Sequence, residues 1–498
     1  MFKIPLVNII GDEGMGYFNS AYTVYTLFYT LSTAGLPVAV SIMISECIAA
    51  NRENEKKGVY KVTFIIFLII GLFGFGVMFF MRNTLASLIG SPFACHCLGA
   101  MSAVLLFVCI SSGVRGYFQG HQIMTPTAVS SVIESGGKLI FGILFALYAI
   151  KKGYPSYIVA AFAVFGITAS SMLCALYLLF SKTVFDRKNG FALGRAKVSY
   201  RKNGMRLLKY AMPITLGSVV MSLCNVLDLA MVIRRLVYTG LDPTEATAVY
   251  GNYSGLCVPL FNMPSAVIAP IGMSVVPYIS GQMVKNEGDE AAKTALSAIR
   301  TVLILSFPCM IGLALFAKPI LRLIFNDEAA MRAYVNMAVL AFSIVGVALT
   351  TVTTAILQGH KRNFLPVISM TAGSFVKLIS GYFLIGRYGM IGTPISTFLC
   401  YMTTSFMNLY FLRRHISIPV NIVGLSFKPF LVSLTSALVS RLVFSFFLFA
   451  GEGLACMIAI AFCGLFYFGA MLIAGGIKKE DLTVFPGGEY INKIFFKS

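Results

Sequence analysis

Long runs of apolar residues, separated by short polar stretches, follow one another along almost the whole chain. As an α-helix, a run of about 20 residues crosses the ~30 Å hydrocarbon core of a bilayer. Runs of this length without strict alternation of apolar and polar positions predict helices rather than strands. We predict thirteen full spans, at about 17–49, 59–81, 93–119, 124–150, 155–181, 205–236, 246–283, 295–317, 332–357, 364–386, 390–412, 424–450 and 453–477.

The first ten residues form a shorter apolar stretch, which the polar turn Gly11–Gly14 ends. We interpret it as the back half of a first span whose front half is missing from this chain. The expected fold is an all-α polytopic membrane protein of about 14 transmembrane helices, in two pseudo-symmetric six-helix lobes plus a C-terminal helix pair. The expected divisions are an N-terminal lobe (1–181), a basic linker (182–204), a C-terminal lobe (205–414), and the helix pair with a tail (415–498).

A short pattern occurs twice and indicates that the two lobes are related. Gln119-Gly120-His121 precedes Lys138, and Gln358-Gly359-His360 precedes Lys377; both Gln-to-Lys spacings are 19 residues, and the copies lie 239 residues apart. Each lysine stands in an otherwise apolar helix. Internal repeats of this kind are typical of transporters whose binding site lies between two halves.

Composition and charge agree with a membrane protein. Hydrophobic residues make up 58% of the chain, charged residues 12%, and mean hydropathy is +0.84, which leaves no room for a sizeable soluble domain. The net charge of +20 is concentrated on one predicted side, above all in the linker, so the positive-inside rule puts both termini in the cytoplasm. We expect the linker to lie beside anionic lipids, and we expect no nucleic acid as a partner.

The eleven cysteines are scattered, and Cys95-His96-Cys97 is the one cluster of ligand-like residues. A metal site usually draws on a second cluster, so we predict no metal and no cofactor.

Charged residues inside predicted spans cost ~2.5–3.5 kcal/mol each on insertion scales and need an explanation. Glu134 and Lys138 are one helical turn apart in the order that favours an ion pair, and Arg115 lies within reach on the preceding helix. Lys377 has no acidic residue one turn away. Two interpretations stay open: mutual neutralisation of Glu134 and Lys138, or an anion-binding site formed by Arg115, Lys138 and Lys377.

Two further sets of residues are candidates for moving or polar elements. Ser218, Ser222, Asn225 and Asp228 recur at helical spacing in one span, either as a packing seam or as a polar stripe in which Asp228 or Glu134 binds a coupling H⁺ or Na⁺. Pro37, Pro264 and Pro270 lie inside spans, where proline frees a backbone carbonyl. They mark either packing kinks or hinges.

The chain resembles the polysaccharide-biosynthesis and stage V sporulation protein B branch of the multidrug/oligosaccharidyl-lipid/polysaccharide flippase superfamily. The stretches that carry the resemblance are Ile9–Tyr17, Leu31–Ser41, Glu46, Gln119–His121, Val249–Pro259 and Gln358–His360. The resemblance implies fourteen helices in two lobes, alternating access, and a lipid-linked sugar as cargo, commonly on undecaprenyl pyrophosphate. Relatives that flip lipid II carry cavity arginines on their first two helices, whereas Tyr25–Thr30 contains none.

The sequence leaves four functions to compare. The first is a flippase of the bacterial cytoplasmic membrane, acting as a monomer on lipid-linked oligosaccharide, polysaccharide or peptidoglycan precursors. The alternative is a cation-coupled multidrug exporter of the same fold. A membrane enzyme is disfavoured, because the predicted external loops are short and poor in acidic, His or Arg residues. The recurring lysines favour an anionic cargo over cationic drugs. A scaffold that transports nothing is the remaining alternative.

Overall fold

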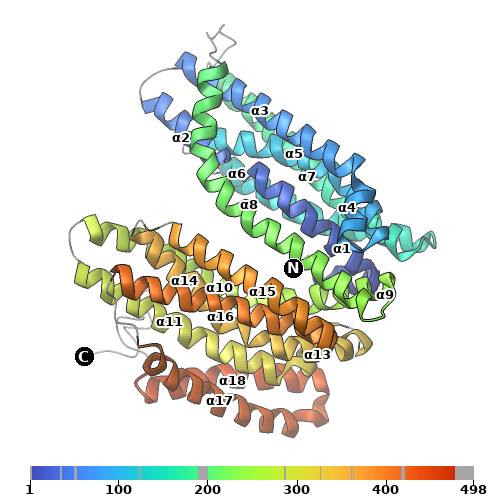
Figure 1. The fold of residues 1–498 in the computed structure, drawn as a ribbon, viewed down its shortest axis with the longest axis vertical. Helices are drawn as coiled ribbons and strands as arrows, with labels where there is room; N and C mark the ends of the chain where they lie inside the picture. Colours follow the sequence, from blue (N-terminus) through green and yellow to red (C-terminus); the bar gives the residue numbers. More distant parts are fainter. Residues whose placement is uncertain are drawn as a thin grey trace. The chain divides into compact units, whose positions relative to one another are not determined.

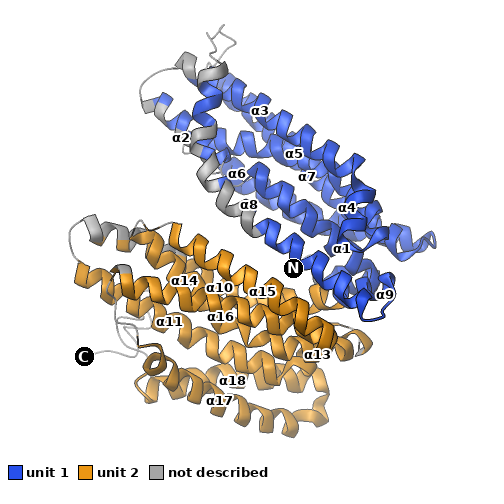
Figure 2. Cartoon of the chain, viewed as in Figure 1, with its two compact units in different colours: residues 1–251 blue, residues 252–498 orange. Residues whose placement is uncertain are grey.

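In the computed structural model, every regular element among the described residues is a helix (Figure 1), which confirms the predicted all-α fold. The structure describes residues 3–33, 36–49, 53–121, 123, 125–188, 200–284, 288–325, 327–360, 362, 364–416 and 421–476. The chain divides into two compact units, Met1–Gly251 and Asn252–Ser498 (Figure 2).

The first unit is built around helix α5, which packs against α1, α2, α3 and α7. Helix α7 also packs along α6, and α8 packs against α1. The helices of this unit are α1 (Lys3–Thr33), α2 (Leu36–Ala49), α3 (Glu53–Phe80), α4 (Arg82–Ile89), α5 (Cys95–Gly120), α6 (Thr125–Lys151), α7 (Ser156–Lys188), α8 (Tyr200–Tyr238) and α9 (Pro243–Asn252).

The second unit is arranged in a similar way around α14, which packs against α10, α11 and α16. Helices α17 and α18 form a pair that packs on α11. The helices of this unit are the π-helix η2 (Tyr253–Cys257), α10 (Val258–Val284), α11 (Gly288–Leu315), α12 (Ala317–Ile324), α13 (Asp327–Ala341), α14 (Ser343–Gly359), α15 (Phe364–Tyr388), α16 (Gly392–Ile416), α17 (Ile422–Phe447) and α18 (Glu452–Ile473).

The internal repeat appears in the packing of α5 and α14. A Cβ on Gly120, at the end of α5, would lie 2.7 Å from the Cβ of Ile44 in α2. A Cβ on Gly359, at the end of α14, would lie 3.0 Å from the Cβ of Ile279 in α10. Both glycines therefore allow a neighbouring helix to approach closely, which is how small residues serve helix packing in membranes.

The histidine of each Gln-Gly-His copy closes the helix that precedes it. Nδ1 of His121 lies 2.9 Å from the carbonyl oxygen of Tyr117, and Nδ1 of His360 lies 2.9 Å from that of Ile356. Each imidazole thus reaches a carbonyl in the last turn that also accepts the backbone N–H of the same histidine. The recurring histidines have a capping role.

The N-terminal break is narrower than the predicted turn Gly11–Gly14. Helix α1 continues through this stretch with one non-helical residue, Gly11 (φ 71°, ψ −179°), a conformation that glycine adopts readily. The following turn packs tightly on α9, since a Cβ on Gly16 would lie 2.1 Å from the backbone oxygen of Thr247. This packing holds the residues after Gly11 in a helix.

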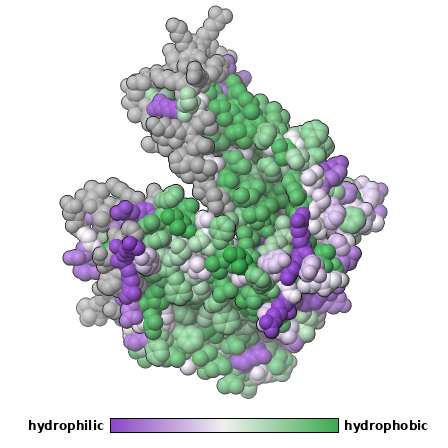
Figure 3. Space-filling view, viewed as in Figure 1, coloured by the Kyte–Doolittle hydropathy of each residue, from purple (hydrophilic) through white to green (hydrophobic). Residues whose placement is uncertain are grey.

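The helices are suited to a bilayer. Among the described residues, nine helices are long and apolar enough to cross a membrane, or ten if the bent pair Glu328–Ala341 and Ser343–Gly359 is one span. Large apolar side chains such as Phe73, Phe180 and Phe383 are exposed on the outside of the units. Figure 3 shows apolar residues covering much of the described helices on the face drawn. The protein is therefore a multi-pass membrane protein, as predicted.

Two short helices were not predicted from the sequence. Helices α4 and α12 have eight residues each and follow the spans α3 and α11. They occupy matching places in the two units. Each buries one side, Ala86 and Ile89 in α4 and Ala317 and Leu321 in α12.

The predicted linker is described only in part. Helix α7 continues to Lys188, α8 begins at Tyr200, and residues 189–199 lie outside the described residues. Helices α8 and α9 belong to the first compact unit, which ends at Gly251. The lobe boundaries at 182 and 205, and the cytoplasmic position of both termini, stay predictions.

Candidate functional site

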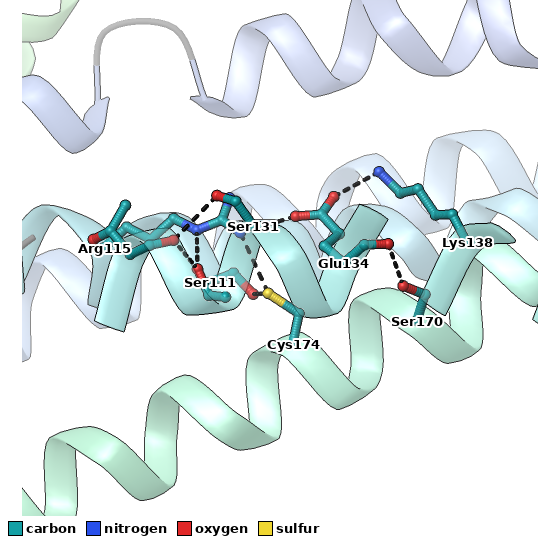
Figure 4. Close-up of polar contacts among 9 residues, drawn as sticks. Ser111, Arg115, Ser131, Glu134, Lys138, Ser170 and Cys174 are labelled. Atoms are coloured by element: carbon teal, nitrogen blue, oxygen red, sulfur yellow. Dashed lines mark hydrogen bonds and ion pairs between the residues drawn. The ribbon is translucent and has the colours of Figure 1, made fainter. Parts of the chain in front are cut away.

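Three charged side chains meet inside the first unit (Figure 4). Nη2 of Arg115 in α5 lies 2.9 Å from Oε2 of Glu134 in α6, and Nζ of Lys138 lies 2.7 Å from Oε1 of the same carboxylate. The three side chains are 17%, 13% and 27% exposed in that order. One carboxylate therefore holds two cations, one on each oxygen. We call these residues the Arg–Glu–Lys cluster; two positive charges and one negative charge leave it at +1.

Further contacts fix the guanidinium of Arg115. Its Nε donates to Oγ of Ser130 at 3.0 Å, and its Nη2 lies 3.3 Å from Sγ of Cys174 in α7. Ser111 donates to the same sulfur at 3.8 Å. Arg115 thus touches α6 and α7 at once, and its fork-shaped head is well suited to several directed contacts.

Helices α6 and α7 bring the cluster together because small residues line their contact. A Cβ on Gly137 would lie 2.6 Å from Oγ of Ser170, and a Cβ on Gly166 would lie 2.4 Å from the backbone nitrogen of Gly142. The hydroxyl of Ser170 donates to the backbone oxygen of Glu134 at 2.7 Å. The turn of α6 that carries Glu134 is therefore held in place from α7.

The arrangement agrees with the sequence analysis for the first unit. The Glu134–Lys138 pair is present, and Arg115 reaches it across the α5–α6 hairpin, as predicted. Two partly exposed cations with one counter-ion leave surplus positive charge within the apolar helices α5 and α6, where ionisable groups are costly.

The second unit has an uncharged cluster at the matching place. Thr354 and Gly373 stand where Arg115 and Glu134 stand in the first unit. Nδ2 of Asn408 in α16 donates to Oγ1 of Thr353 at 3.0 Å and to Oγ1 of Thr354 at 3.2 Å. Lys377 is half-buried in α15. The two units therefore share the lysine and differ in its surroundings.

The predicted polar stripe of α8 is only partly a packing seam. Oγ of Ser222 donates to Oγ1 of Thr30 in α1 at 2.9 Å, so this part of the stripe joins α8 to α1. Asn225 is exposed, and Asp228 is half-buried. A role for Asp228 or Glu134 in ion coupling stays a prediction.

The candidate hinge prolines lie in regular helix. Pro37 is the second residue of α2, a position in the first turn where proline costs no helical hydrogen bond. Helix α10 continues across Pro264 and Pro270. The irregular turn is the π-helix η2, which ends just before Pro259, whose missing N–H favours such a local change. Hinge motion at these prolines stays a prediction.

Sequence reasoning missed the residues that support the charged cluster. Ser130, Ser170 and Cys174 are small residues of kinds that occur throughout the spans, so no spacing singles them out. It also missed a cluster at the end of α7. Nζ of Lys182 lies 4.2 Å from the ring centroid of Tyr60, and Tyr117 donates to Asp186 at 2.9 Å.

This second cluster includes the first residue of the predicted linker. The side chain of Lys182 is only 18% exposed and pairs with Asp186. Its ammonium also lies 5.2 Å from the ring centroid of Tyr117, so two aromatic rings stabilise this cation.

Comparison with protein-family models gives two matches. The polysaccharide biosynthesis protein model matches residues 1–283, more than half of the chain. The MatE model matches residues 213–383.

Individual proteins agree with these matches. The lipid II flippase MurJ of Bacillus subtilis (strain 168) is 26% identical over 490 residues, which cover 94% of this chain and 86% of that protein. Stage V sporulation protein B of the same organism is 25% identical over 337 residues, which cover 66% of this chain and 63% of that protein.

A solved structure of a lipid II flippase MurJ in an inward closed conformation has the same fold, with a TM-score of 0.66 over 93% of this chain and 98% of that one, at 15% identity. The resemblance read from the sequence is confirmed. The chain belongs to the polysaccharide biosynthesis protein family, a branch of the multidrug/oligosaccharidyl-lipid/polysaccharide flippase superfamily.

Proposed function

We propose that this protein is a flippase that carries a lipid-linked oligosaccharide, polysaccharide or peptidoglycan precursor across the bacterial cytoplasmic membrane by alternating access. The observation that carries the proposal is the Arg–Glu–Lys cluster, which keeps surplus positive charge inside the first unit of a protein of this family. Similarity to a lipid II flippase along 94% of the chain supports it.

The cluster offers what a phosphate head group needs. Arg115 supplies a planar fork of N–H donors and Lys138 a compact charge, and charge-assisted contacts of both kinds are the strong ones for phosphate. A lipid-linked sugar on undecaprenyl pyrophosphate is the cargo that we propose, and we propose Lys377 as a further cargo-binding residue. Helix α1 has tyrosines rather than arginines at 22, 25 and 29, with ring centroids 5.7 and 5.6 Å apart along the row. The cations therefore come from α5 and α6.

Several finer points belong to the same proposal. H⁺ or Na⁺ is the coupling ion that we propose, with Asp228 or Glu134 as its site. The basic stretch from 182 to 204 lies on the cytoplasmic side beside anionic lipids, the protein works as a monomer, and both termini are cytoplasmic.

A cation-coupled multidrug exporter is the second candidate. The observation in its favour is the MatE match to residues 213–383. Drug exporters of this kind take cationic, apolar cargo, for which lysines within the spans are unsuited. The net positive cluster in the first unit therefore favours the flippase.

Transport by purified protein in vesicles separates the two candidates. The flippase should move a fluorescent oligosaccharide on undecaprenyl pyrophosphate to the opposite leaflet, measured by chemical quenching of the outer leaflet, and should leave ethidium uptake at background. Lys138→Gln should slow flipping about ten-fold or more, because one charge-assisted contact is lost. Lys293→Gln, which removes an exposed lysine that also pairs with a glutamate, is the matched control and should flip at the normal rate. Ethidium transport without lipid flipping would show that the protein is a drug exporter and not a flippase.

A further inference from the structure

Both cations of the Arg–Glu–Lys cluster already hold an anion, and that anion belongs to the protein. Oε2 of Glu134 lies against Arg115 and Oε1 against Lys138, so each carboxylate oxygen occupies the direction from which a cargo oxygen would approach. We propose that Glu134 is a resident counter-ion that competes with the phosphate of the cargo for Arg115 and Lys138, and so sets how tightly the cargo binds and how fast it leaves. This inference rests on the flippase function proposed above.

The geometry makes the carboxylate a small stand-in for a phosphate. Two oxygens on one centre contact one guanidinium and one ammonium at 2.9 and 2.7 Å, as two oxygens of one phosphate group would. The pyrophosphate of a lipid-linked sugar has two such phosphate groups, with four non-bridging oxygens and two negative charges, against two oxygens and one charge in a carboxylate. It can therefore replace Glu134 at both cations at once, whereas a neutral sugar or a cationic drug cannot.

Arg115 has more partners than Lys138, and this difference decides which side chains move when the cargo phosphate replaces the carboxylate. Arg115 has Ser130 and Cys174 as further partners, so its head stays in place when the carboxylate leaves. The backbone of Glu134 is held by Ser170, so only the side chain of Glu134 needs to rotate. For Lys138, the partner found among the described residues is the Glu134 carboxylate. Arg115 is thus the fixed donor and Lys138 the mobile one.

A resident counter-ion solves two problems of a flippase. Two cations held close together inside the apolar helices without an anion would destabilise the empty protein, and Glu134 reduces that repulsion between cycles. The same carboxylate returns when the cargo has crossed, and its return displaces the phosphate. Without such a competitor the head group would stay bound, because a ligand that binds too tightly leaves slowly.

The second unit lacks this counter-ion at the matching position. Gly373 stands one turn before Lys377, as Glu134 stands before Lys138. A Cβ on Gly373 would lie 2.1 Å from Oγ1 of Thr404, so no acidic side chain fits there. Competition between the cargo phosphate and a carboxylate one turn before the lysine is therefore a property of the first unit.

The test is the affinity of the full-length protein for undecaprenyl pyrophosphate, measured by native mass spectrometry in detergent. Glu134→Gln should bind it about ten-fold more tightly than wild type, because the competing charge is removed, and should flip the lipid-linked oligosaccharide several-fold more slowly. The double variant Glu134→Gln/Lys138→Gln is the matched control. It has the same net charge as wild type but lacks the mobile donor, and it should lose the gain in affinity.

The outcomes are separable. If folded Glu134→Gln binds no more tightly than wild type while wild type still flips, the counter-ion role is wrong and the proposed function stands. If wild type neither binds nor flips the lipid, the proposed function itself fails. Should Glu134→Gln not fold, Glu134→Asp serves instead: its side chain is one carbon shorter and cannot hold both cations, so tighter binding than wild type is expected, and equal binding overturns the inference.

Discussion

Tyr467 in α18 donates a hydrogen bond of 2.7 Å to the backbone oxygen of Ile304 in α11. Pro308 lies inside α11, four residues after Ile304, and has no N–H to give that oxygen. Tyr467 and Ile304 are 0% and 2% exposed, so water does not reach the bond. Inside a bilayer an unsatisfied carbonyl is costly, and the tyrosine hydroxyl supplies the missing donor. The C-terminal helix pair is thereby tied to the helix that carries the proline.

Tyr467→Phe should therefore lower the free energy of unfolding by about 1–3 kcal/mol, because it leaves a buried acceptor without a partner. Adding Pro308→Ala should restore most of this loss, since alanine brings back the backbone N–H. Denaturation of the purified protein in detergent, as a double-mutant cycle, measures the coupling. Strictly additive effects of the two substitutions would show that the hydroxyl and the proline are unrelated.

The glycines of the Gln-Gly-His copies should be intolerant of any side chain. Gly120→Ala places a methyl group 2.7 Å from the Cβ of Ile44, so we expect a loss of about 1–3 kcal/mol from overpacking. Gly136→Ala in α6 is the control: a Cβ there meets nothing within 4 Å, and alanine suits a helix better by about 0.5–1 kcal/mol. Thermal unfolding in detergent compares the two. Equal stability of both variants would mean that α2 and α5 can move apart freely.

The sequence was a good guide to the long elements, for a physical reason. Each predicted span corresponds to one helix or to consecutive helices, because burying some twenty apolar residues in lipid leaves a pattern that is hard to miss. The Glu134–Lys138 pair was readable because residues four apart meet on one helix. Lys377 was found through the repeat, not through any local signal.

Features that depend on one or two contacts could not be predicted from the sequence. Helices α4 and α12 are too short to leave a clear apolar period. The break at Gly11 was expected to be a whole turn, since nothing local shows that α9 packs on the next turn of α1. Ser130 and Cys174 hold the head of Arg115 from other helices. Their position depends on close packing of α5, α6 and α7.

The start of α9 should depend on pH through its capping residue. Asp242 precedes α9 and accepts hydrogen bonds from the hydroxyl and, at 3.0 Å, the N–H of Thr244. These bonds lower the pKa of Asp242 below its ordinary value, the hydroxyl first and then the N–H. A carboxyl with a lowered pKa stabilises the folded state above its unfolded pKa of about 3.9, and that stability is lost as pH falls through the lowered value.

Hydrogen exchange in α9 measures this effect. Amide protection near Thr244 should fall as the solution is acidified below about pH 4. Asp242→Asn keeps an acceptor but does not titrate, so its protection should vary less with pH. A pH dependence equal in wild type and Asp242→Asn would assign the effect to another group.

Lys377 tests whether the second unit takes part in transport. It recurs at the place of Lys138, it is half-buried in α15, and the packing of Gly373 on Thr404 excludes an acidic side chain one turn before it. We propose that this lysine, like Lys138, contacts the anionic cargo. Lys377→Ala should therefore slow flipping of the lipid-linked oligosaccharide about ten-fold or more, while the protein still inserts and accumulates normally. Lys377→Arg should keep part of the rate, since the charge stays and its geometry changes.

Arg387→Gln, at the exposed end of the same helix, controls for the loss of a positive charge and should flip normally. A normal rate for well-folded Lys377→Ala would leave the repeated lysine with a role in packing alone.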